Sequence, residues 1–208
     1  MSFLEQLNPE QREAVLHRDG PLLILAGAGS GKTRVICYRL AYLIGDGHAE
    51  PDQVLAVTFT NKAAEEMRTR VEQLLESESP RLWISTFHAF CARLLRREAP
   101  RIGLSRDFVI YDSVDQLSAI RQAMRDLNVD DKITPPRSLL SRISHAKNRM
   151  ESASDIRQNS HGFGDDQLAA VYERYLQTLT QSGALDFDDL LLKAVTLFET
   201  SDGARERY

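Results

Sequence analysis

The 208-residue sequence predicts an α/β fold, with a parallel sheet in its first half and a mainly helical second half. Short apolar runs alternate with amphipathic helical patterns up to about residue 98, which is typical of a parallel sheet covered on both faces. Beyond Asp112 the patterns are helical. With 42% hydrophobic and 27% charged residues, the composition excludes collagen-like, low-complexity and wholly disordered classes.

In the first half we expect three strands, each followed by a helix. The strands are continuous apolar runs, and the helical patterns between them have ordinary lengths for crossover helices. We expect a break at Ser77–Pro80 to end the second of these helices. The predicted elements are strand Leu22–Ala26, helix Gly31–Ile44, strand Val54–Thr58, helix Asn61–Leu75, strand Leu82–Ser85 and helix Phe87–Glu98.

The second half begins with a possible last strand, Phe108–Asp112, and then reads as helices only. Ser113 and Gln116 form a predicted capping box for a helix that reaches about Leu127. The polar stretch Met150–Gly164 is expected to be a mobile loop. Further helices are predicted to begin at Pro136, at Asp166 (ending near Gly183) and at Phe187. The domain boundary is expected between Ala89 and Asp112, which gives domains 1–89 and 90–208.

Charge, cysteine content and apolar runs set limits on function. Lys and Arg total 26 against 30 acids, so the net charge of −4 gives no global signature of a nucleic-acid binder. Cys37 and Cys91 lack metal-ligand spacing, and we expect buried, reduced thiols. The longest apolar runs, such as Leu22–Ala26, are shorter than the ~20 residues of a membrane-spanning helix, and the start lacks a secretory pattern. The sequence therefore predicts a cytoplasmic protein with no membrane partner.

A glycine-rich loop follows the first predicted strand. Its eight residues, Ala26-Gly27-Ala28-Gly29-Ser30-Gly31-Lys32-Thr33, lead directly into an amphipathic helix. Gly29 and Gly31 allow backbone N–H groups to surround a phosphate at the helix N-terminus, Lys32 can reach the β and γ phosphates, and the Thr33 hydroxyl can bind Mg²⁺. Ala26 stands where the strict P-loop pattern has Gly, and its small side chain is a tolerable substitute. The loop predicts a nucleotide site.

Upstream of this loop, Asn8, Pro9 and Gln11 form a helix-start pattern. Asn8 would be the N-cap, Pro9 the first helical residue, and Gln11 the partner that closes a capping box. A ligand role for Gln11 is equally compatible with the sequence alone. Both interpretations stay open at this point.

Five segments in order resemble the amino-terminal motifs of the UvrD, Rep and PcrA superfamily 1 DNA helicases. Their order and spacing are far more specific than any one of them, and the resemblance covers essentially the whole chain. The segments are LNPEQREAV (7–15), AGAGSGKT (26–33), VTFTNKAAEEMRTRV (57–71), STFHAFCARLLRR (85–97) and ALDFDDLL (184–191).

The resemblance implies a first RecA-like motor domain with an inserted all-helical subdomain, from an ATP-dependent enzyme that tracks single-stranded DNA in the 3′-to-5′ direction. It implies ATP and Mg²⁺ as cofactors, single-stranded DNA and duplex junctions as partners, and DNA-repair or replication proteins as possible further partners. The family's acidic magnesium motif, arginine finger and second motor domain would lie beyond Tyr208. Phe108–Asp112 imitates the acidic strand, although Asp112 is better explained as a strand end or helix cap.

Matched position by position, the resemblance also implies roles for individual residues. Gln11 would hydrogen-bond the adenine, and Lys32 and Thr33 would act in catalysis. The alternative for Phe59 is a core aromatic, and for His88 a hydrogen-bonded structural residue. The nucleotide would be held by Gln11, Ala26, Gly27, Ala28, Gly29, Ser30, Gly31, Lys32, Thr33 and Arg34, and the DNA by Phe59, Thr60, Asn61, Thr86 and His88.

Two basic clusters offer further DNA contacts. Residues 89–106 hold five arginines and one acid, and Lys132–Met150 holds Lys147 and four other cations with no acid. Arg142, His145 and Arg149 fall on one helical face, suited to phosphate contacts. A solvated helix face has the same pattern, so both interpretations stay open for Arg142 and Arg149.

Three functions compete. The leading hypothesis is a DNA-dependent ATPase and helicase of which these 208 residues are a part. A P-loop phosphotransferase acting on a small molecule, with the helical half as a lid, is the alternative. The third is a nucleotide- and DNA-binding module without turnover, which we expect of these residues in isolation.

Overall fold

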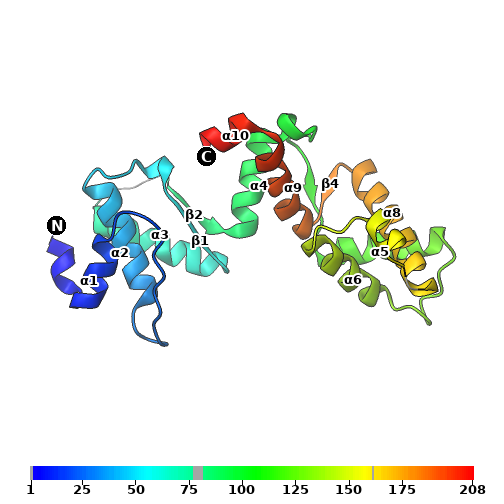
Figure 1. Cartoon of the computed structure of the whole chain (residues 1–208), viewed down its shortest axis with the longest axis horizontal. Coiled ribbons are helices and arrows are strands. Elements are labelled where there is room, and N and C mark those ends of the chain that lie inside the picture. Colours follow the sequence, from blue (N-terminus) through cyan, green and yellow to red (C-terminus); the bar gives the residue numbers. More distant parts are fainter. Residues whose placement is uncertain (1, 77–81, 161) are drawn as a thin grey trace. The chain divides into compact units, whose positions relative to one another are not determined.

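The computed structural model describes residues 2–76, 82–160 and 162–208 (Figure 1). It is a mixed α/β structure, mostly helical, with two small parallel sheets in the described part of the chain. The chain divides into two compact units, Met1–Phe90 and Cys91–Tyr208. The predicted break at Ser77–Pro80 lies outside the described residues.

The first unit contains one parallel strand pair with helices packed beside it. Strands β1 and β2 pair along their whole length, from Leu55 opposite Trp83 to Thr58 opposite Thr86. Helix α3 is the crossover between them and packs against both strands and against α2 (Figure 1). The elements are η1 Ser2–Gln6, α1 Pro9–Leu16, α2 Lys32–Gly45, η2 Pro51–Gln53, β1 Leu55–Thr58, α3 Asn61–Leu75, β2 Trp83–Thr86 and α4 Phe87–Glu98, which runs into the second unit.

The predicted strand Leu22–Ala26 is wrong for this structure, because these residues pair with no strand in the described part of the chain. A strand is defined by hydrogen bonds to a neighbour, and in the described chain the only partner of β1 is β2. Ile24 packs against the core of the first unit, whereas Leu23 and Leu25 are 81% and 86% exposed. Leu22 is also exposed, at 41%, so the segment has neither the pairing nor the alternating burial of a half-buried strand.

The second unit is mainly helical but not all-helical, which corrects the sequence prediction. A two-residue parallel pairing joins Val109 to Ala184 and Ile110 to Leu185. The core beneath it is built by α5, α6 and α8. The elements are η3 Ala99–Ile102, β3 Val109–Ile110, α5 Ser113–Asp126, α6 Pro136–Asn148, α7 Ala153–Gln158, α8 Phe163–Gln181, β4 Ala184–Leu185, α9 Phe187–Thr200 and α10 Asp202–Arg207.

Three helices of this unit differ from the prediction, and local caps explain two of them, α5 and α7. The box that starts α5 is formed by Asp112 and Asp115, one residue before the predicted pair, so Asp112 is a helix cap. Ser152 caps α7 inside the stretch that was expected to be a loop. Helix α8 begins at Phe163, three residues earlier than expected.

Burial explains the state of both cysteines. Cys37 and Cys91 are buried in their helices, and neither forms a disulfide. Burial raises the pKa of both thiols, which keeps them in the unreactive thiol form. Unreactive thiols of this kind agree with the structural role expected from the sequence.

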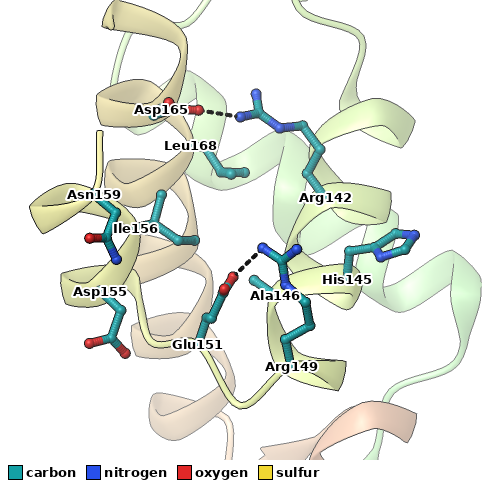
Figure 2. A pocket seen from close by; sticks show the side chains of 10 residues that line it. All are labelled: Arg142, His145, Ala146, Arg149, Glu151, Asp155, Ile156, Asn159, Asp165 and Leu168. Carbon is teal, nitrogen blue, oxygen red and sulfur yellow. Dashed lines mark hydrogen bonds and ion pairs between the residues drawn. The ribbon is translucent and has the colours of Figure 1, made fainter. Parts of the chain in front are cut away.

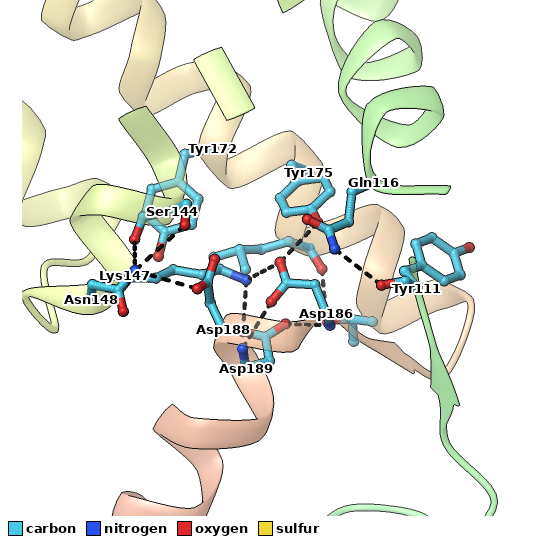
Figure 3. A network of polar contacts seen from close by, with 12 residues as sticks. Tyr111, Gln116, Ser144, Lys147, Asn148, Tyr172, Tyr175, Asp186, Asp188 and Asp189 are labelled. Atoms are coloured by element: carbon cyan, nitrogen blue, oxygen red, sulfur yellow. Dashed lines mark hydrogen bonds and ion pairs between the residues drawn. The ribbon is translucent and has the colours of Figure 1, made fainter. Parts of the chain in front are cut away.

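A buried ion network holds α6, α8 and α9 together (Figure 3). Lys147 is 1% exposed, and its Nζ donates to Asp186 Oδ2 at 2.6 Å and Asp189 Oδ1 at 2.7 Å. The Tyr175 hydroxyl donates to Asp186 Oδ2 at 2.8 Å. Burial raises the pKa of Asp189, although the charge of Lys147 opposes this. Lys147 is therefore a structural cation and does not belong to the basic surface on which the sequence placed it.

The carboxylate of Glu98 holds two ends of the second unit together. It is 4% exposed and accepts hydrogen bonds from Arg101 Nε at 2.7 Å, Arg207 Nη1 at 3.2 Å and the Tyr208 hydroxyl at 3.0 Å. Burial alone would raise the pKa of Glu98, but these donors together lower it. The end of α4 is thereby fixed to α10.

Loss of the Lys147 charge should destabilise the second unit strongly. Lys147→Met leaves Asp186 and Asp189 buried without a counter-charge, and breaking a buried pair in this way costs about 3–5 kcal/mol. Lys132→Met is the matched control because Lys132 is exposed, and it should change the free energy of unfolding by less than about 0.5 kcal/mol. Urea denaturation measures both. Equal stability of the two variants would show that the network contributes nothing.

Candidate nucleotide and DNA sites

The glycine-rich loop has the backbone geometry that a phosphate site needs. It runs from the extended segment at Ala26 into α2, whose first residue is Lys32. Gly29 and Gly31 have φ of 76° and 87°, values that side chains disfavour. An added Cβ at Gly27 or Gly29 would meet nothing within 4 Å. The loop is therefore open to a ligand at the positive end of a 14-residue helix.

Polar groups of the loop are arranged by contacts within it. Lys32 Nζ donates to the carbonyl oxygens of Ala26 at 2.8 Å and Gly27 at 2.6 Å, and Ser30 Oγ donates to Gly27 O at 2.7 Å. Lys32 and Thr33 are exposed in the first turn of α2. An exposed ammonium, a hydroxyl and free helix N–H groups are the donors that fit a nucleotide phosphate and its Mg²⁺. Within the described residues, no cluster of three His, Cys, Asp or Glu could hold a metal by itself.

Gln11 serves the helix cap and also contacts the loop. Its backbone N–H donates to Asn8 Oδ1 at 2.8 Å, and its own Oε1 accepts from the Asn8 N–H at 3.3 Å, so the predicted capping box is confirmed. Its Nε2 donates to Ser30 O at 3.1 Å. A Cβ on Gly31 would lie 3.0 Å from that nitrogen, so Gly31 is needed for this approach as well as for its φ.

Arg34 is directed elsewhere, although the resemblance implies a nucleotide contact. Its Nη2 donates to Gln6 O at 3.0 Å, and its guanidinium lies 5.1 Å from the centre of the Tyr38 ring. The Tyr38 hydroxyl donates to Gln6 Oε1 at 2.8 Å. Arg34 thus joins α2 to η1. Tyr38 was missed from the sequence because it reads as an ordinary buried residue of an amphipathic helix.

The carboxyl ends of β1 and β2 form a second candidate site. Because Thr58 and Thr86 are paired, the residues that follow the two strands emerge at the same edge of the sheet. The Thr60 hydroxyl accepts from the Ala63 N–H at 3.1 Å and caps α3, and the Thr86 hydroxyl accepts from the Ala89 N–H at 3.3 Å. Asn61 and His88 are exposed in the first turns of α3 and α4. Two helix N-termini therefore open at one edge.

An exposed aromatic pair lies at this edge. Phe59 is 91% exposed, so the alternative that its ring belongs to the core is wrong. Phe87 is 45% exposed, and the two ring centres are 6.4 Å apart at 49°. Phe87 was not among the residues predicted from the sequence, but its position directly after β2, like that of Phe59 after β1, was a usable signal. Exposed aromatic faces beside helix N-termini suit a stacked base and a phosphate.

Arg142 and Arg149 project from α6 into a cavity of the second unit (Figure 2). Neither guanidinium is without a partner. Arg142 Nη2 is 2.8 Å from Asp165 Oδ1, and Arg149 Nη2 is 2.7 Å from Glu151 Oε2. A phosphate would have to compete with both carboxylates.

No helix in the described ranges combines the length and apolar character needed to cross a membrane. This is consistent with the absence of a long apolar run in the printed sequence.

Comparison with known proteins identifies the family. A family model described as the UvrD/REP helicase N-terminal domain matches residues 7–208. The chain is 44% identical over 207 residues to the ATP-dependent DNA helicase PcrA of Staphylococcus epidermidis and 46% identical over 206 residues to PcrA of Bacillus subtilis. These alignments cover 100% and 99% of the chain but only 28% of either relative. The chain belongs to the UvrD/REP helicase N-terminal domain family.

Proposed function

We propose that the chain is the nucleotide-binding part of an ATP-dependent DNA helicase that moves 3′-to-5′ along single-stranded DNA. The observation that supports this proposal most directly is the open glycine-rich loop at the start of α2, which the Gln11 side-chain amide contacts. In this proposal residues 1–89 form the first part of a RecA-like motor domain, and residues 90–208 a mainly helical subdomain. Action in the cytoplasm, in DNA repair or replication, belongs to the same proposal.

The loop residues would bind the phosphates of ATP. Backbone N–H groups at the start of α2 and the Lys32 ammonium would hold the anion, and the Thr33 hydroxyl would bind Mg²⁺, which supplies charge neutralisation when bound. Lys32 would exchange its two carbonyl partners for phosphate oxygens, which is a gain because hydrogen bonds between charged groups are stronger. Gln11 would present its amide to the adenine. On their own, the 208 residues are proposed to bind nucleotide without turnover.

The edge formed by the ends of β1 and β2 would bind the DNA strand. Phe59 would stack on a base, while Thr60, Asn61, Thr86 and His88 would lie near the backbone. Support comes from the exposure of Phe59 and from its neighbour Phe87.

In this proposal, the packing of α2 against α3 links the nucleotide site mechanically to the DNA site. The nucleotide loop precedes α2 and the DNA-facing loop precedes α3, and the two helices share a buried core that includes Cys37 and Met67. Close-packed helices transmit a shift as a unit, because a buried interface tolerates little local deformation. A movement at Lys32 would therefore reach Thr60 through two rigid helices.

Removal of the Lys32 charge should weaken nucleotide binding. Charge-assisted contacts of this type contribute about 1.5–3 kcal/mol, so Lys32→Ala should lower ATP affinity by roughly tenfold or more in calorimetry. Lys62→Ala is the control, because Lys62 is exposed on α3 and forms only a weak pair with Glu66 at 4.0 Å. Unchanged ATP affinity in a folded Lys32→Ala variant would refute the assignment of the loop.

The role of Gln11 can be separated from its cap by a matched variant. Gln53 closes a similar box at Glu50, where its Oε1 accepts from the backbone N–H at 2.9 Å, and no hydrogen bond among the described residues joins it to the glycine-rich loop. Gln11→Ala and Gln53→Ala should each cost no more than about 1 kcal/mol of stability. Only Gln11→Ala should narrow the preference for ATP over GTP, measured by competition binding. Equal selectivity in both variants would leave Gln11 with the capping role alone.

Phe59 should act on DNA by stacking, which is uncharged. Phe59→Ala should weaken binding of single-stranded DNA by about 1–3 kcal/mol without changing the dependence on salt concentration. Phe163→Ala is the control because that ring is 82% exposed but lies in the other unit. Fluorescence anisotropy at several salt concentrations tests both. Normal binding by Phe59→Ala would remove the ring from the proposed DNA path.

A further inference from the structure

The cavity beside α6 has a volume of about 420 Å³, and its two walls carry opposite charges (Figure 2). Two arginines and a histidine come from successive turns of α6 and from the residue that caps its end. Carboxylates come from the turn before α7, from α7 itself and from the first turn of α8. The basic wall has Arg142, His145 and Arg149, and the opposite wall has Glu151, Asp155 and Asp165.

The exposed surface of α6 carries hydrogen-bond donors and no acid. Over Pro136–Asn148 the sequence has no Asp or Glu, and its hydrophobic residues Leu139 and Ile143 face the core. Taken alone, this face would suit a row of phosphates, since arginine and hydroxyl groups are common partners of the DNA backbone. The exposed polar residues are Arg137, Ser138, Ser141, Arg142, His145 and Asn148.

Two ion pairs at the cavity limit the binding of phosphate by Arg142 and Arg149. Asp165 accepts from Arg142 at 2.8 Å and Glu151 accepts from Arg149 at 2.7 Å, while Gly164 O is a further acceptor for Arg142 at 3.3 Å. Asp155 takes no part, because it accepts from the Ser152 N–H and hydroxyl at the start of α7. Arg142 and Arg149 are 43% and 69% exposed, so water screens both pairs and each is weak enough for a competing anion to break.

We propose that Asp165 and Glu151 are specificity-determining residues of the DNA interaction, an inference that rests on the proposed function. They hold Arg142 and Arg149 away from phosphate until a ligand offers phosphates to both arginines together. A lone phosphate must displace one carboxylate and still faces its repulsion, whereas a duplex backbone engages both arginines and releases counterions at each. The acids thereby favour a dense polyanion over an isolated anion.

Neutralising the two acids should release the arginines. Asp165→Asn combined with Glu151→Gln keeps the side-chain shapes and should tighten binding of a short labelled duplex by about two- to thirty-fold. The slope of log affinity against log salt should steepen by up to about 0.9 for each released arginine. Fluorescence anisotropy on the 208-residue chain measures both quantities, and thermal unfolding confirms that the variant is folded.

Two comparisons separate release of the arginines from a general loss of negative charge. The first comparison is Asp126→Asn combined with Glu173→Gln. These acids pair with Arg174 at 2.6 Å and with Arg157 at 2.9 Å, and none of the four residues lines the cavity. This variant should gain less affinity for the duplex. In an Arg142→Ala, Arg149→Ala background, neutralising Asp165 and Glu151 should give no gain. An equal gain in either comparison, or no gain in the original variant, overturns the inference. Failure of every variant to bind any DNA would instead count against the proposed function.

Discussion

The parallel pairing of β1 with β2 is the constraint on which the first unit depends. Parallel strands need a crossover, and α3 supplies it, so both strands must end at the same edge. The loops that begin α3 and α4 are then neighbours, although Phe87 is 27 positions after Thr60 in the printed sequence. Antiparallel pairing would send Phe59 and Phe87 to opposite edges. The register from Leu55–Trp83 to Thr58–Thr86 therefore creates the aromatic pair.

In the second unit, the burial of a cation depends more on the acids that pair with it than on its position in the sequence. Lys147 and Arg149 are two residues apart in the same basic cluster, yet one is 1% exposed and the other 69%. Lys147 faces two buried aspartates from α9, whereas Arg149 meets Glu151 at the surface. A count of charges along the sequence predicts that both are surface cations. Helical spacing shows on which face of the helix a residue lies, but it does not show which acids another element places opposite that residue.

Local signals predicted the elements that depend on local interactions. Four helices begin at the expected residues: α3, α4, α6 and α9. A cap or a proline marks the start of three of them, and β2 leads directly into α4. Strand β4, which was missed, is two residues long and exists only against β3. Helix α7 was missed although the Ser152–Asp155 capping box that starts it is a local signal, because the polar stretch around it was expected to be a loop. The glycine-rich loop was predictable for the same reason as the caps, whereas Asp165, which pairs with Arg142 across 23 positions of the sequence, was not.

The segment before the glycine-rich loop, residues 22–26, has the apolar sequence of a strand but no strand partner in the described part of the chain. Ile24 packs inward, whereas Leu22, Leu23 and Leu25 are exposed, so only one residue of the predicted strand reaches the core. Two large exposed leucines on an unpaired edge are costly in water, since each would gain about 1.5–3 kcal/mol from burial. The loop geometry nevertheless persists, because Gly31 fits against Gln11 and Lys32 holds the carbonyls of Ala26 and Gly27. The glycine-rich loop is thus fixed by its own contacts and by Gln11 of α1, although the segment that leads into it has no strand partner in the described part of the chain.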